Sequence, residues 1–403
     1  MPDLAVAYVM LGVIDCEQNL DEAAISNFET AMRIEPGNDQ ASFFAASLYL
    51  KNLAYDDAER TLKQTLAAHP GHLGALKSLG ELMVKTNRYE EAVGFLRDVL
   101  ALSPREVDSA AYLIQAEAIA VDPEVGVATA MQLKPHFRES IDVSEAHIFA
   151  LIRAGQYEEA IRLCDEVIEK TRNPTSIIAY KAAALVEAHH DEAASECLAM
   201  DRFVSVEMLP TPQGYDDIDT FNASLVTQIR QDETLADHAS NRSLINASDT
   251  LELFTGDETG AVKDLHASIH EHVEEYIETL DAGDGHPFIN SKPDEFLIEA
   301  WANVYPRSGK QLAHFHPPAW LSGVYYPKVP RKLTVNELGE QEGALALGRA
   351  YYRLQAKRES IVKEVLPRSG TIILFPSFVG HNTVPITSTD ETRISVAFNV
   401  VGL

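Results

Sequence analysis

Three histidines and one arginine near the end of the chain have residue types and spacing suited to metal chemistry. His314 and His316 are two positions apart, so on a strand both imidazoles would point to the same face. His381 follows 65 positions after His316, and Arg393 stands 12 positions further on. Imidazole suits iron, zinc and copper, and a guanidinium can bind a carboxylate through two parallel hydrogen bonds. The pattern predicts a metal held by histidines, with a cationic anchor close by.

The elements around these residues have the pattern of β-strands. Short alternating or apolar segments with turn residues between them occupy 301–305, 321–326, 371–376 and 393–400. Several short strands of this kind predict a barrel or a sandwich. Ser395 shares the parity of Arg393 on the last strand, and Asn303 shares the parity of Tyr305 on the first. Each pair is therefore expected on one face of its strand.

In their order along the chain, these motifs resemble the 2-oxoglutarate- and Fe(II)-dependent oxygenases. The strings that carry the resemblance are Asn303-Val-Tyr305, His314-Phe-His-Pro317, Leu321 to Tyr326, Gly370 to Ser377, His381, and Arg393 to Asn399. The resemblance covers about the last 200 residues and is sharp over 300–400. It implies a double-stranded β-helix (a jelly-roll, cupin-like fold) with flanking helices, and Fe(II) and 2-oxoglutarate as cofactor and cosubstrate.

The resemblance also implies roles for individual residues. His314 matches the first iron ligand, and His381 matches the distal histidine ligand. Arg393 matches the residue that pairs with the far carboxylate of 2-oxoglutarate, and Ser395 matches a hydroxyl that assists it. Tyr326 falls where related hydroxylases place a tyrosine on the same carboxylate. Asn303 and Tyr305 are expected to line the pocket, and no catalytic residue is expected beyond the metal ligands.

The sequence departs from the family pattern at His316. The usual facial triad has a carboxylate at this position, two residues after the first histidine. His316 can be the third ligand of a three-histidine site, or it can lie off the metal and leave two histidines and a water. The site can also have lost its redox function. Glu337, Glu340 and Glu342 offer carboxylates nearby in sequence, but a solvated loop is the favoured interpretation for them.

The first half of the chain has an internal repeat. Pro36, Pro70 and Pro104 are spaced by 34 residues. Small residues recur in the same phase at Ala24, Ala58, Ala92, Ala160 and Ala194, and larger apolar residues follow four positions later at Phe28, Leu62, Leu96, Cys164 and Leu198. Each unit reads as two amphipathic helices that must stack on neighbouring units to bury their apolar faces. A fourth unit near 107–140 is irregular, with Gly126 in place of the small alanine.

In period and motif the repeat resembles the tetratricopeptide repeat, with about six units over 5–203. We therefore expect an α+β multidomain protein: a helical superhelix over 1–203 and the β-domain over 204–403. The resemblance implies a concave surface that holds a protein or peptide; a dimerisation element or rigid spacer is the alternative. A Pro- and Gly-containing stretch over 206–215 is expected to be the linker, followed by helices over 217–232 and 258–280.

Composition narrows the class of protein further. The 61 acidic and 33 basic residues give a net charge of −28, which opposes binding to nucleic acid and to anionic membranes. Three scattered cysteines predict reduced thiols. The N-terminal sequence does not read as a secretory leader, and no apolar run is long enough to span a membrane. We expect a soluble, cytoplasmic protein.

These observations together predict a 2-oxoglutarate-dependent dioxygenase that hydroxylates a protein or peptide presented by the repeat domain. Two alternatives stay open. One is a scaffold or sensor whose β-domain binds metal without catalysis, and the other is a three-histidine cupin enzyme that does not use 2-oxoglutarate. Arg393 and Ser395 favour a dicarboxylate cosubstrate and therefore speak against the last alternative.

Overall fold

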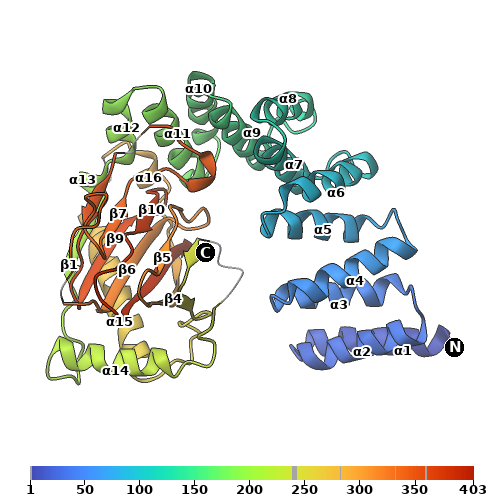
Figure 1. Ribbon diagram of the computed structural model, residues 1–403, viewed down its shortest axis with the longest axis horizontal. Coiled ribbons are helices and arrows are strands. Elements are labelled where there is room, and N and C mark those ends of the chain that lie inside the picture. The colour runs from blue at the N-terminus through green and yellow to red at the C-terminus, as the bar shows by residue number, and fades with distance from the viewer. Residues whose placement is uncertain (1, 238–242, 282, 332, 359–360) are drawn as a thin grey trace. The chain divides into compact units, whose positions relative to one another are not determined.

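The computed structural model describes residues 2–237, 243–281, 283–331, 333–358 and 361–403. It divides into two compact units, one ending at Ala154 and the other running from Gly155 to Leu403 (Figure 1). The first unit is helical, and the second combines helices with antiparallel sheets. A helical repeat followed by a β-domain confirms the predicted fold class in outline.

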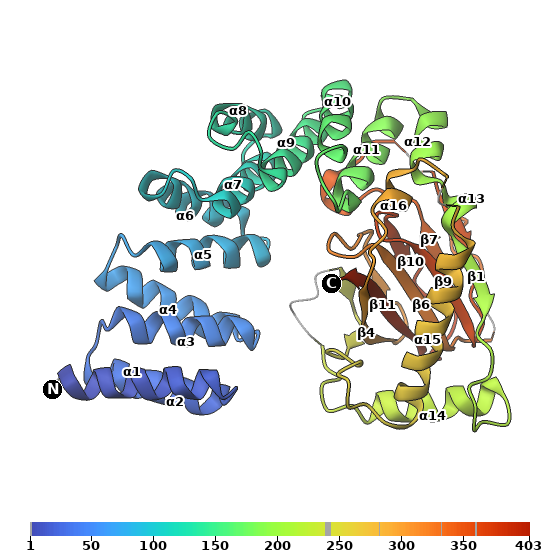
Figure 2. The same cartoon turned by 180° about the vertical axis from the view of Figure 1, so that it is seen from behind.

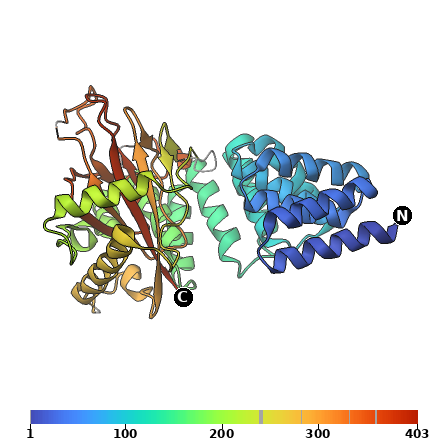
Figure 3. The same cartoon turned by 90° about the horizontal axis from the view of Figure 1, so that it is seen from below.

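The first unit consists of helices, of which the first eight pack in consecutive pairs and the ninth packs against the seventh and eighth (Figures 1 and 3). They are α1 (Pro2–Glu17), α2 (Asp21–Ile34), α3 (Asp39–Lys51), α4 (Tyr55–Ala68), α5 (Leu73–Lys85), α6 (Tyr89–Leu102), α7 (Val107–Ala120), α8 (Pro123–Leu133) and α9 (Ile141–Arg153). The phased alanines Ala24, Ala58 and Ala92 are fully buried. A Cβ at Gly12 would lie 2.6 Å from the Phe28 ring, so the small residue of one helix receives the large residue of the next.

The irregular fourth unit also has a physical explanation. Asp122 caps α8 by accepting the backbone N–H of Glu124 at 2.9 Å, and Pro123 takes the first helical position, where its missing N–H costs nothing. A Cβ at Gly126 would lie 2.8 Å from both the Ala118 Cβ and the Ile114 carbonyl oxygen. Glycine is needed because α8 approaches α7 more closely than alanine would allow. Pro123 thus begins a helix instead of ending one.

The second unit starts with helices and continues into the β-domain. The helices are α10 (Tyr157–Ile168), α11 (Thr175–Glu187), α12 (Asp191–Leu198), α13 (Met200–Phe203), α14 (Ile218–Arg230), α15 (Gly260–Thr279), α16 (Pro287–Asn290) and the 3-10 helix η1 (Tyr352–Leu354). The strands are β1 (Ser205–Met208), β2 (Leu244–Ile245), β3 (Ser248–Asp249), β4 (Phe296–Tyr305), β5 (Lys310–Gln311), β6 (Leu321–Lys328), β7 (Leu345–Leu347), β8 (Lys363–Val365), β9 (Thr371–Pro376), β10 (His381–Thr383) and β11 (Arg393–Gly402). All four strands and both later helices expected from the sequence are present.

The strands form antiparallel sheets. The largest has the order β1-β9-β6-β11-β4-β3, and β10-β7-β8 and β2-β5 form two smaller sheets. Helix α15 covers one face of the large sheet (Figure 2). The expected linker over 206–215 is wrong at its start, because Ser205–Met208 forms the edge strand β1 on β9. This edge strand joins the helical and sheet parts of the unit directly.

One hydrophobic core spans the helices and sheets of the second unit. Ile178 and Ala182 of α11 and Leu198 of α12 belong to the same buried cluster as Ile373 and Phe398 of the large sheet. The compact units therefore divide after Ala154, whereas the sequence led us to expect a boundary at 203/204. Periodicity cannot distinguish a repeat that stacks on another repeat from one that packs on a sheet, because both bury the same helix faces.

The sequence also predicted reduced cysteines and the absence of a membrane-spanning segment. Cys16, Cys164 and Cys197 form no disulfide bond with one another. Within the described ranges, no helix is both long enough and apolar enough to cross a membrane.

Candidate metal centre

The segment that carries His314 and His316 is held next to His381 by backbone hydrogen bonds. The His314 N–H donates to the His381 carbonyl at 3.0 Å, and the His381 N–H donates back to the His314 carbonyl at 2.8 Å. The His316 N–H donates to the Ser377 carbonyl at 3.2 Å. His314 forms an isolated bridge to His381 and is not part of a continuous strand, so the two imidazoles of the H-x-H segment do not owe their position to strand geometry.

The three imidazoles converge in space. One ring nitrogen from each of His314, His316 and His381 lies within 4.8 Å of the others. The His314 and His381 ring centroids are 4.3 Å apart, and those of His316 and His381 are 5.2 Å apart. Among the described residues this is the one group of histidine, cysteine and acidic side chains with metal-binding geometry. His266 and His270, four positions apart on α15, belong to no such group among the described residues.

Two of the rings are oriented by backbone carbonyls. His314 Nδ1 lies 2.8 Å from the Leu312 oxygen, and His381 Nδ1 lies 3.1 Å from the Val379 oxygen. A carbonyl can only accept, so Nδ1 carries the proton in both rings and Nε2 keeps its lone pair. This is the tautomer in which a neutral histidine binds a metal through Nε2, with its other nitrogen held by an acceptor.

Burial keeps all three imidazoles neutral. It lowers the pKa of His314 to about 4, and it lowers the pKa values of His316 and His381 well below the ordinary range, helped by the neighbouring histidines. Desolvation disfavours the charged form of a histidine. Since a metal competes with protons for the imidazole lone pair, these sites are prepared for a metal at neutral pH.

His316 is oriented by a side chain instead of a carbonyl. Its Nδ1 lies 3.3 Å from Asn399 Nδ2 on β11. The Asn399 Oδ1 accepts from the Ser322 hydroxyl at 2.9 Å, and the Ser322 and Ser377 hydroxyl oxygens are 2.8 Å apart. Ser322 and Ser377 are buried, and Asn399 is only 8% exposed. The H-x-H segment, β6, β11 and the end of β9 thus meet in one hydrogen-bonded chain.

No carboxylate joins the histidine cluster in the described part of the chain. Glu342 is buried, but it accepts hydrogen bonds from Thr334, Thr387 and Ser388, which lower its pKa to about 2 against the effect of burial. Glu340 forms an ion pair with Arg349. The expectation of a solvated loop is therefore wrong for Glu342. Its buried carboxylate links the segment at Thr334 to the segment at Thr387 and Ser388.

Arg393 is buried in the sheet without an acidic partner. It is 1% exposed, and its Nη1 donates to the Gly343 carbonyl at 3.3 Å. Its guanidinium carbon lies 4.2 Å from the centroid of the Tyr305 ring, and its Nε is buried with no hydrogen-bond partner. None of the ion pairs among the described residues involves Arg393. A buried guanidinium in this state is costly unless an anion binds it.

The remaining predicted residues lie on strands β4, β6 and β11. The register pairs Arg393 with Tyr305 and Ser395 with Asn303, so these four side chains share one face of the sheet. Asn303 Oδ1 is buried without a partner. Tyr326 on β6 is 1% exposed; burial raises its pKa, and the positive charge of Arg393 opposes that rise. Every residue predicted for the pocket therefore lies in the same part of the β-domain.

Sequence reasoning missed three residues of this site. It did not assign a role to Asn399, Ser322 or Ser377, although Asn399 has the same strand parity as Arg393 and Ser395. That parity was the available signal. The contact with His316 could not be predicted because it joins residues 83 positions apart.

Helix α11 supports the ligand segment from the outside. The Thr175 hydroxyl donates to the Ala319 carbonyl at 2.9 Å, and Asn173 Nδ2 donates to the Pro317 carbonyl at 3.0 Å. The Tyr180 ring meets the Phe315 ring edge to face at 5.6 Å. Phe315 stands between the two histidines, so the last helical repeat positions the metal segment directly.

Two separate parts of the chain match known families. Residues 299–399 match the family described as "Putative 2OG-Fe(II) oxygenase". Residues 17–68 and 53–118 match the tetratricopeptide repeat. These matches confirm both family resemblances inferred from the sequence.

Individual relatives resemble the repeat half. The TPR repeat-containing protein YpiA of Bacillus subtilis is 22% identical over 168 residues, which are 42% of this chain and 40% of the length of that protein. A tetratricopeptide repeat protein from Parabacteroides merdae is 12% identical with a TM-score of 0.45, and the match covers 49% of this chain and 78% of that one. MamA of Desulfovibrio magneticus is 19% identical with a TM-score of 0.39, covering 41% and 94% respectively.

Proposed function

Because this chain joins tetratricopeptide repeats to a domain that matches the 2-oxoglutarate–Fe(II) oxygenase family, we propose that it is an Fe(II)- and 2-oxoglutarate-dependent hydroxylase of a protein or peptide. The observation that carries the proposal is the buried Arg393, whose Nε has no partner. It lies on the same strand face as Asn399, the residue in contact with His316. A dicarboxylate bound at the metal would supply the missing anion.

The donor set fits the iron of this family. His314 and His381 would hold Fe(II) through Nε2, and His316 would provide a third imidazole. Arg393 and Tyr326 would hold the far carboxylate of 2-oxoglutarate, with Ser395 assisting. When bound, the metal and cosubstrate supply the oxidation: 2-oxoglutarate gives succinate and CO₂, and O₂ contributes one oxygen atom to the succinate and one to the substrate C–H bond.

The chain's own residues bind and orient these groups and limit access of water. Phe375 meets His381 edge to face at 4.8 Å, and Trp301 lies 5.7 Å from the His316 ring. Asn303 and Tyr305 would line the pocket beside Ser395 and Arg393, their cross-strand neighbours. A double-stranded β-helix is the arrangement that the family implies for these strands.

The repeat unit is proposed to recognise the substrate. Stacked tetratricopeptide repeats generally bind proteins or peptides, and nothing in the described contacts of the unit points to chemistry of its own. This makes a macromolecular substrate more consistent with the chain than a free metabolite.

The first test is anaerobic binding of 2-oxoglutarate to the Fe(II)-loaded full-length chain, followed by its visible charge-transfer band. We expect a band in the wild type and a loss of 2-oxoglutarate affinity of about 10- to 100-fold in Arg393→Lys, since lysine keeps the charge but loses the bidentate geometry. The control is Arg368→Lys, an exposed arginine at the turn before β9. Bound iron without a band in the wild type would refute the proposal.

A second candidate is a three-histidine enzyme that does not use 2-oxoglutarate. The all-imidazole cluster favours it, because the usual carboxylate ligand is absent from the described group. In that case Arg393→Lys would leave metal binding unchanged, and 2-oxoglutarate would not perturb the metal spectrum.

A further inference from the structure

The three histidines differ in how their second ring nitrogen is held. His314 and His381 face backbone carbonyls, which can only accept a hydrogen bond. His316 faces the side-chain amide of Asn399, which can either donate through Nδ2 or accept through Oδ1. The tautomer of His316 therefore depends on the orientation of one amide, whereas the tautomers of the other two rings are determined by the backbone.

The chain behind Asn399 can satisfy both orientations. In the first, Asn399 Nδ2 donates to His316 Nδ1, Ser322 donates to Asn399 Oδ1, and Ser377 donates to Ser322. In the second, His316 Nδ1 donates to Asn399 Oδ1, Asn399 Nδ2 donates to Ser322, and Ser322 donates to Ser377. A serine hydroxyl can serve as donor or acceptor, so each orientation keeps all of these buried contacts.

Only the second orientation leaves His316 able to bind a metal. When Nδ1 accepts from Asn399, the neutral ring carries its proton on Nε2, the nitrogen that remains to face the other two histidines. When Nδ1 donates, Nε2 keeps its lone pair. The two orientations correspond to a site with two available imidazoles and a site with three.

We propose that Asn399 is a positioning residue that makes His316 the third metal ligand by accepting its Nδ1–H, and that Ser322 and Ser377 stabilise this orientation. The inference rests on the proposed metal function of the site. Metal binding selects the orientation in which Asn399 accepts. The third ligand is thus conditional on a buried side-chain network, which the conventional carboxylate ligand of the family does not require.

The test counts the bound histidines in the Co(II)-loaded full-length chain by proton NMR. Each imidazole that binds through Nε2 gives one hyperfine-shifted, solvent-exchangeable Nδ1–H resonance. We expect three such resonances in the wild type and two in His316→Ala. Asn399→Leu is expected to lose the His316 resonance and about 10- to 100-fold in Co(II) affinity, measured by competition with a chelator.

A second variant distinguishes an effect of the Asn399 amide orientation from a general loss of folding. Asn399→Asp has nearly the same shape but offers only acceptors to His316, so it should keep three resonances and bind Co(II) at least as tightly as the wild type. The control is Asn222→Leu, which removes another buried asparagine, bonded to Tyr325 at 2.6 Å and not to a histidine. It should keep three resonances and the wild-type affinity.

The outcomes distinguish this inference from the function on which it rests. Two resonances in the wild type, together with a 2-oxoglutarate band, would overturn the role of Asn399 and leave a two-histidine oxygenase. Three resonances and unchanged affinity in Asn399→Leu would also overturn it, as would loss of a resonance in Asn399→Asp. A wild-type chain that binds no Co(II) would overturn both proposals.

Discussion

At the scale of single residues, this protein buries titratable groups in their neutral or unpaired state. The three clustered histidines are neutral because desolvation disfavours their charged forms, and Arg393 is charged but lacks an acidic partner. Both conditions cost free energy, and a bound cation and anion would offset this cost. Desolvation also disfavours the charged form of a histidine outside the site, His147 on α9.

His147 is expected to make the protein less stable in acid. Burial lowers its pKa to about 4, with a contribution from Lys134, and its Nε2 is buried without a partner. Between about pH 6.5 and pH 4 the unfolded chain binds a proton that the folded chain does not. Its contribution to the free energy of unfolding therefore falls as the pH drops through this window, by up to about 3 kcal/mol.

The measurement is urea unfolding of wild type and His147→Leu at neutral pH and near pH 5, followed by far-ultraviolet circular dichroism. The stability difference between the two pH values should be smaller in His147→Leu than in the wild type. Leucine also removes an unpartnered buried nitrogen, so the variant should be no less stable at neutral pH. Equal pH dependence in both proteins would contradict the assignment.

At the scale of elements, the contact between β6 and β11 determines the geometry of the site. Strand β6 carries Tyr326 and Ser322, and strand β11 carries Arg393 and Asn399. Gly323 pairs with Phe398 across them, and a Cβ at Gly323 would lie 2.1 Å from the Phe398 ring. The buried ring occupies the space that a side chain would need, and this brings the two strands together.

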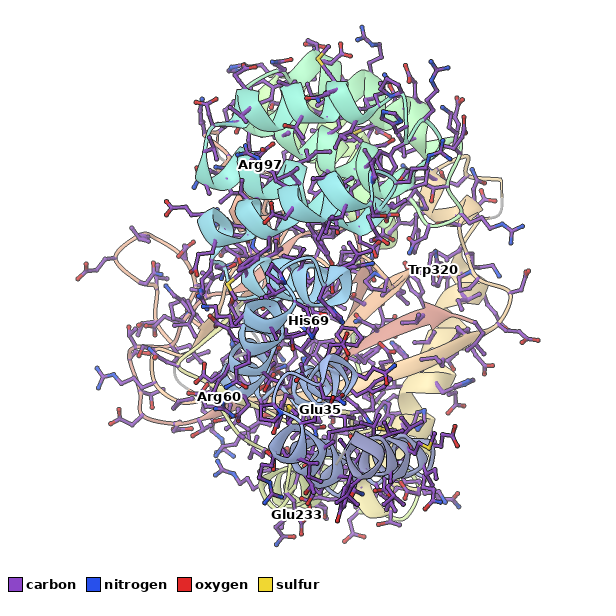
Figure 4. The ribbon with its side chains drawn as sticks, turned by 90° about the vertical axis from the view of Figure 1, so that its right-hand side faces the viewer. Glu35, Arg60, His69, Arg97, Glu233 and Trp320 are labelled. Carbon is purple, nitrogen blue, oxygen red and sulfur yellow. The ribbon has the colours of Figure 1, made fainter. Side chains whose placement is uncertain are left out.

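Gly323→Ala should therefore destabilise the β-domain by about 1–3 kcal/mol and weaken Co(II) binding, because the ring of Phe398 must move and shift β11. Tryptophan fluorescence during urea unfolding reports the effect, since both tryptophans, Trp301 and Trp320, lie in the second unit. Figure 4 labels Trp320, which directly precedes β6.

The matched control is Gly94→Ala, at an exposed position within α6 where a Cβ would meet nothing within 4 Å. Alanine has the higher helix propensity there, so the first unit should be about 0.5–1 kcal/mol more stable than in the wild type. Far-ultraviolet circular dichroism measures this gain, because both tryptophans lie in the second unit, and tryptophan fluorescence should be unchanged. A Gly323→Ala protein with wild-type stability would show that the Phe398 ring can move freely.

At the scale of the whole molecule, the last helical repeat belongs to the oxygenase-like unit. Glu187 at the end of α11 accepts the backbone N–H groups of Lys357 and Arg358 at 2.7 and 2.8 Å, and α11 also contacts the ligand segment through Thr175 and Tyr180. These contacts lie within the unit that begins at Gly155. The helices that resemble a binding repeat therefore also support the metal centre.

A fragment spanning 155–403 is expected to fold and to bind Co(II) with the affinity of the full-length chain. A fragment spanning 204–403 lacks α11 and α12 and leaves their part of the core exposed, so it should bind Co(II) at least tenfold more weakly or aggregate. Chelator competition and analytical size exclusion measure the two properties. Full Co(II) affinity in the shorter fragment would show that α11 is dispensable for the site.

The local features of the chain could be read from the sequence because they depend on local rules. The phased alanines predict close helix packing, and the order of His314, His381 and Arg393 matches the oxygenase pattern. The alternation of β4 and β11 predicts which side chains share a face. Propensity, periodicity and motif spacing act over a few residues or over fixed intervals, so one chain is sufficient to reveal them.

Tertiary structure alone determines which distant groups meet. It brings Asn399 to His316, it directs Glu342 to three hydroxyl-bearing side chains and not to the histidine cluster, and it joins α11 to the β-domain core. Each of these outcomes depends on packing between segments dozens of residues apart. Their side chains have several possible partners in the sequence and acquire particular ones only when the whole core forms.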